Sequence, residues 1–130
     1  MSKGRSTEPP VIPPPPFPWL AVIIALLVGS AGWELACRLS GRSEAWDSAA
    51  YWRLAYPLFG VAVLVLAFFW PRSRWLTWAA LALGQALVMF AKNPGGSLLP
   101  LGVIVMLVMC APLMIAGRLG ARLHAWRRGR

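Results

Sequence analysis

The sequence predicts an all-α integral membrane protein in which four transmembrane helices form an up-down-up-down bundle. Hydrophobic residues make up 58% of the 130-residue chain and its mean hydropathy is +0.62, which is more than a soluble domain of this size carries. Nearly all of the 13 basic and four acidic residues lie between long apolar runs rather than within them. Each of four such runs has close to the number of residues, about 20, that crosses the roughly 30 Å hydrocarbon layer as a helix.

The predicted spans, in chain order, cover residues 17–39, 49–70, 75–91 and 98–117. They are helices rather than strands, because a membrane strand alternates in polarity whereas these runs are continuously apolar. Pro71 ends the second span and Ser73 can cap the third, and Ser97 can cap the fourth after a turn rich in Gly and Pro. Connections this short predict that successive spans are antiparallel neighbours.

Two prolines fall in the interior of predicted spans, away from their first residues. Pro57 lies in the second span and Pro112 in the fourth. Proline lacks the backbone N–H that an α-helix needs and its ring clashes with the preceding turn, so both positions are expected to bend their helices. Such bends serve packing or act as hinges, and static bends are the preferred interpretation.

The distribution of Lys and Arg predicts that both termini are cytoplasmic. Nine of the 13 basic residues fall on the side that holds the N-terminus, the second loop and the C-terminus: Lys3, Arg5, Arg72, Arg74, Arg118, Arg122, Arg127, Arg128 and Arg130. The other four are Arg38, Arg42, Arg53 and Lys92. This asymmetry is the positive-inside pattern of an inner-membrane protein, most simply a bacterial one. It also predicts contact with anionic lipid headgroups and removes the need to invoke nucleic-acid binding.

Two terminal segments flank the transmembrane domain, which we assign to residues 19–117. Residues 1–18 form a proline-rich cytoplasmic segment that favours an extended polyproline conformation. This segment is either a docking peptide for a proline-recognising partner or, as we prefer, a stiff lead-in to the membrane. Residues 118–130 form an Arg-rich cytoplasmic tail.

Ionisable residues within membrane spans are costly, which makes Glu34 the leading candidate for a site. Arg38 lies four residues later on the same helix face, with the acid in the more favourable N-terminal position. Asp47, Tyr51 and Arg53 begin the second span at a similar height, so the five residues form a predicted polar cluster at the outer face. The cluster is either an ion-pair network that fixes two helices or a binding site for a headgroup, an amphiphile or a partner's charged loop.

Three further residues are predicted to pack helices together. Gln85 falls near mid-bilayer, where its amide is expected to bond a neighbouring helix. Gly29 and Gly84 each follow an alanine by four residues, a spacing that permits close contact between helices. The cysteines, Cys37 and Cys110, lie at different depths and are expected to be free thiols.

Catalysis is not expected, because the residues that chemistry requires are missing from the spans. The single histidine, His124, lies in the basic tail, so neither a metal set nor a nucleophile with its base can be assembled, and no cofactor is predicted. We expect a non-catalytic accessory or assembly subunit that docks through its helices onto a larger membrane complex or associates with itself. The alternative is a small homodimeric transporter, or a lipid- or amphiphile-binding protein, that uses Glu34 at the outer face.

Overall fold

The computed structural model describes residues 9–10, 18–41, 45, 48–92 and 99–130. Within these residues, four helical segments are long and apolar enough to cross a membrane: Pro18–Ser40, Tyr51–Phe69, Pro71–Lys92 and Pro100–Arg128. The predicted fold class, an all-α bundle of four transmembrane helices, is confirmed. Asp47, the turn at 93–97 and most of the proline-rich segment lie outside the described residues.

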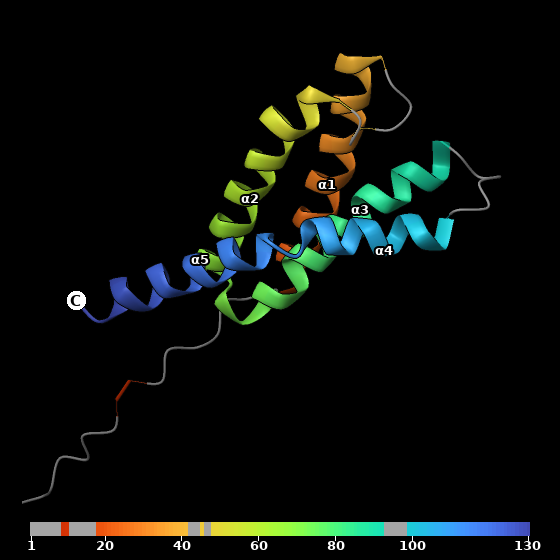
Figure 1. The fold of residues 1–130 in the computed structure, drawn as a ribbon. Helices are drawn as coiled ribbons and strands as arrows, with labels where there is room; N and C mark the ends of the chain where they lie inside the picture. The colour runs from red at the N-terminus through yellow and green to blue at the C-terminus, as the bar shows by residue number, and fades with distance from the viewer. Residues whose placement is uncertain (1–8, 11–17, 42–44, 46–47, 93–98) are drawn as a thin grey trace, which may run out of the picture.

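The elements are α1 (Pro18–Ser40), a π-helical turn η2 (Tyr51–Ala55) that leads into α2 (Tyr56–Phe69), and a 3-10 turn η3 (Pro71–Ser73) before α3 (Arg74–Lys92). The fourth span consists of α4 (Leu99–Cys110) and α5 (Leu113–Arg128). In Figure 1, α1 and α2 run side by side in opposite directions, and α4 and α5 lead back from the far end of α3 to the C-terminus. One end of the bundle therefore carries the C-terminal ends of α1 and α3.

Each internal proline changes the helix that contains it. Ahead of Pro57, the N–H of Tyr56 bonds to the carbonyl of Tyr51, five residues back, which makes the π-helical turn. At Pro112 the fourth span breaks into α4 and α5, and the N–H of Met114 bonds to the carbonyl of Ala111 at 3.0 Å. The hydroxyl of Tyr56 donates to the carbonyl of Met109 at 2.6 Å, which satisfies a backbone acceptor beside the break.

The most extensive contacts join α1 to α3 and α2 to α5 rather than spans that follow each other in the chain. A Cβ atom on Gly29 would collide with the carbonyl oxygen of Leu81, and one on Gly84 with that of Leu26. The hydroxyl of Ser30 donates to the carbonyl of Gly84 at 3.0 Å across this contact. Tight backbone approach is how membrane helices associate, because lipid tails are as apolar as the side chains they would replace.

The α2–α5 contact uses two glycines, Gly117 and Gly120, that were not among the predicted packing residues. A Cβ on Gly120 would collide with the carbonyl oxygen of Leu64, and Gly117 lies beside Val63. Helix α5 continues to Arg128, eleven residues beyond the predicted end of the span at 117. Its last turns still pack on α2, because the ring of Phe68 contacts His124 at 5.7 Å between centroids and lies under the guanidinium of Arg127.

Candidate functional site

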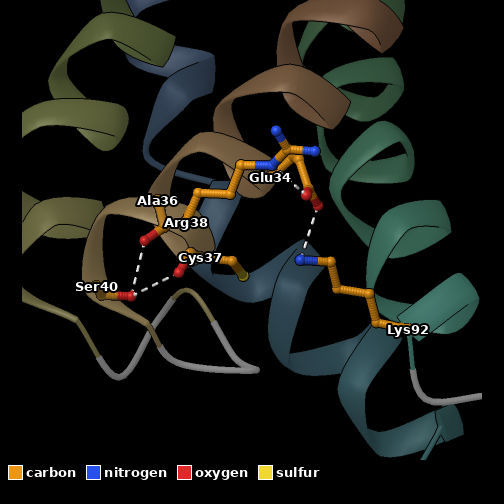
Figure 2. Close-up of polar contacts among 6 residues, drawn as sticks. All are labelled: Glu34, Ala36, Cys37, Arg38, Ser40 and Lys92. Carbon is orange, nitrogen blue, oxygen red and sulfur yellow. Dashed lines mark hydrogen bonds and ion pairs between the residues drawn. The ribbon is translucent and has the colours of Figure 1, made fainter.

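Glu34 lies between two cations at the end of the bundle where α1 and α3 finish, which we call the Glu34 end (Figure 2). Its Oε1 accepts a hydrogen bond from Nε of Arg38 at 2.8 Å, and its Oε2 lies 2.7 Å from Nζ of Lys92. Both carboxylate oxygens are thus engaged by cations. The Arg38 contact spans one turn of α1, whereas the Lys92 contact joins α1 to α3.

The predicted polar cluster is therefore only partly assembled in the described residues. Glu34 and Arg38 are paired, but Arg53 is exposed on the second span, and Tyr51 points into the bundle with no exposed surface. The π-helical turn that begins at Tyr51 shifts the register of the helix face at this point, which hydropathy does not predict. The second ion pair of Glu34 is made with Lys92 of α3, whereas the prediction placed residues of the second span beside Glu34.

Lys92 could have been recognised from the topology. It ends the third span, and in an up-down-up bundle the first and third spans end on the same side of the membrane. Glu34 lies close to that end in a span with no other acid, so a lysine at the same height is a natural counter-ion. In the sequence-based prediction Lys92 contributes only to the orientation of the spans and is not a predicted partner of Glu34.

A second set of polar residues, formed by Tyr51, Gln85 and Cys110, lies inside the bundle and links three spans. The Tyr51 hydroxyl donates to Oε1 of Gln85 at 2.7 Å, and Nε2 of Gln85 donates to Sγ of Cys110 at 3.4 Å. Trp33 of α1 packs edge-on against Tyr51 with centroids 5.8 Å apart. All four spans thus meet around Gln85, and Tyr51, Gln85 and Cys110 are all fully buried.

This buried network joins the spans through polar groups that bond to one another. The Gln85 amide uses both its acceptor and its donor side on neighbouring helices, and the thiol of Cys110 is free of any disulfide. An unpaired amide in hydrocarbon would be costly, so these bonds favour one relative placement of the spans. The role of Cys110 was not anticipated, because a thiol is a weak acceptor and sequence gives no sign of its orientation.

An apolar groove lies between α1 and the second span on the same half of the bundle. Its volume is about 240 Å³ and it is lined almost entirely by apolar atoms. Small residues occur on both walls, namely Ala31, Gly32 and Ala36 of α1 and Ala50 and Ala55 of the second span. Leu35 and Leu54 flank the opening and are about half exposed. The groove exists because α1 packs mainly on α3 and contacts α2 much less.

Comparison of the chain with known protein families, with curated proteins and with solved structures finds no match to any of them.

Proposed function

We propose that this protein is a non-catalytic subunit of a larger membrane complex and that it docks a transmembrane helix of its partner in the groove between α1 and the second span. The observation that carries the proposal is the groove itself, which has small residues on both walls and an apolar lining. Small residues let the backbones of membrane helices approach closely, which is the usual basis of their association. A partner helix fits this lining better than a charged ligand does.

The two ion pairs of Glu34 favour a subunit of a complex over a transporter. A transport carboxylate has to exchange between a free and an occupied state, and in this protein each oxygen of Glu34 already contacts a cation. The polar groups around Gln85 are likewise bonded to one another. These bonded groups therefore support a role in holding the bundle together rather than in binding a transported ligand.

The groove can be tested by crosslinking and by filling it. A photoreactive amino acid at Leu35 or Leu54 is expected to crosslink one partner of fixed stoichiometry in native membranes, whereas the same group at Val108, an exposed residue of α4, is not. Ala31→Trp should fill the groove, so that the complex dissociates on gentle-detergent extraction. Val108→Trp should leave the complex intact. A particle that contains only this chain, or an assembly that survives Ala31→Trp, would refute the proposal.

We also propose that the protein resides in a bacterial inner membrane with both termini in the cytoplasm. The support is the positive-inside asymmetry, which places nine of 13 basic residues on the side of the termini. Green fluorescent protein fused after Arg130 should fluoresce, and alkaline phosphatase fused there should be inactive. The opposite pair of results would invert the topology.

A further inference from the structure

The end of the bundle opposite Glu34, where α3 begins and α5 passes, carries arginines that have no acidic partner among the described residues; we call it the arginine end. Glu34 is the only acidic residue among those the structure describes, and it is engaged by Arg38 and Lys92. Arg74 and Arg118 at the arginine end therefore have no Asp or Glu partner among the described residues.

Arg74 and Arg118 converge on the same aromatic ring. The guanidinium carbon of Arg74 lies 6.0 Å from the centroid of Trp75, and that of Arg118 lies 5.6 Å from it. Gly117 of α5 lies directly beside Arg74, since a Cβ added to Gly117 would be in ordinary van der Waals contact with Arg74, 3.6 Å from its carbonyl oxygen and 3.8 Å from its Cβ. Two like charges brought against one ring repel each other, and an anion between or beside them removes that repulsion.

Two buried N–H donors at this site, one on Arg74 itself and one on Trp78, also lack an acceptor. Nε of Arg74 and the indole Nε1 of Trp78 are buried and have no hydrogen-bond partner in the described structure. Both residues line a recess of about 10 Å³, together with Trp75, Met114 and Arg118. That volume holds about one oxygen-sized atom. A buried donor without a partner is costly, so an oxygen acceptor in this recess would be stabilising.

We propose that the recess between the start of α3 and α5 binds the phosphate of an anionic phospholipid headgroup. One phosphate oxygen would accept from Nε of Arg74 and Nε1 of Trp78, and the remaining oxygens would face the exposed guanidinium of Arg118. Arginine suits this ligand because its planar donors match phosphate geometry. A lipid is the natural source of the phosphate, since the site lies at the end of a membrane span beside the exposed aromatic ring of Trp75.

The test is native mass spectrometry of the full chain, delipidated in nonionic detergent and titrated with phosphatidylglycerol, phosphatidylcholine or inorganic phosphate. We expect one molecule of phosphatidylglycerol to bind at least tenfold more tightly than phosphatidylcholine. Arg118→Gln should weaken that binding about tenfold, and because its side chain is exposed the fold should persist. Trp78→Phe should weaken it less, since it removes only the indole donor. Arg128→Gln, which removes the same charge from the end of α5, is the matched control and should bind as the unaltered chain does.

Equal loss in Arg118→Gln and Arg128→Gln would show diffuse attraction to a basic surface and would overturn the proposal. Equal binding of phosphatidylcholine would also overturn it, because the site would then not select a net negative headgroup. Inorganic phosphate that binds as tightly as the lipid and displaces it would make the ligand a free phosphate rather than a lipid. None of these outcomes depends on the groove between α1 and the second span.

Discussion

Replacing Gly84 with alanine should separate α1 from α3 and destabilise the bundle. The new Cβ would collide with the backbone carbonyl of Leu26, which cannot rotate away as a side chain would, so the two helices have to move apart. Overpacking of this kind costs about 1–3 kcal/mol. Separation also breaks the Ser30–Gly84 hydrogen bond, worth about 0.6 kcal/mol in a membrane protein.

Gly60→Ala is the matched control, because a Cβ on Gly60 meets only Cδ2 of Leu113 at 3.8 Å, an ordinary contact. Both substitutions place alanine in a helix interior and gain about 1 kcal/mol of helix propensity, which cancels in the comparison. The free energy of unfolding of Gly84→Ala should therefore fall below that of Gly60→Ala by about 2.5 kcal/mol. That difference corresponds to roughly 70-fold in the unfolding equilibrium.

Two buried cysteines can report on unfolding in this measurement. Cys37 and Cys110 are buried and neither is in a disulfide, so a thiol-reactive dye labels them only when the bundle opens. Labelling would be followed in lipid bicelles as sodium dodecyl sulfate is added, and the denaturant midpoints of the two variants compared. Equal midpoints would refute the close α1–α3 contact on which the fold depends.

Two further predictions concern the polar contacts between spans. Gln85→Leu should destabilise the bundle by about 1 kcal/mol, because it leaves the Tyr51 hydroxyl without its acceptor. In a double-mutant cycle with Tyr51→Phe the two losses of stability should not add. Additive losses would mean that the Tyr51–Gln85 hydrogen bond contributes nothing to stability. Lys92→Gln should lower the unfolding midpoint more than Arg38→Gln does, because Lys92 joins α3 to Glu34 on α1 whereas the Arg38 contact lies within one helix. The reverse order would place the Glu34 ion pair outside the contact between the two helices.

Hydropathy was sufficient to predict the four spans, but it could not predict how they rotate about their axes. In a membrane, lipid tails and protein interior are equally apolar, so a leucine carries no information about the face it occupies. Leu66 and Leu81 are buried, whereas Leu54 and Leu58, which precede Leu66 in the same span, are about half exposed. The pairing of α1 with α3 and of α2 with α5 depends on this rotation and was therefore not predicted.

The sequence indicated which polar residues would be important in the spans, but not which residues they would bond to. Gln85 was singled out because an amide in hydrocarbon needs a partner, and the structure supplies Tyr51 and Cys110. Tyr51 itself was assigned to the outer cluster, because the π-helical turn that Pro57 imposes is a local departure that a regular helix period does not contain. The break at Pro112 was predicted as a bend, because the missing backbone N–H of proline disrupts its own helix whatever the helix packs against.

The two proposed contacts use opposite halves of the molecule, which makes them separable. The groove lies between α1 and the second span toward the Glu34 end, and the phosphate recess lies between α3 and α5 at the arginine end. No residue lines both of them. Ala31→Trp should therefore leave phosphatidylglycerol binding unchanged, and Arg118→Gln should leave the assembly intact. If either substitution abolished both properties, its effect would be on the stability of the bundle, and the contact assigned to that residue would have to be withdrawn.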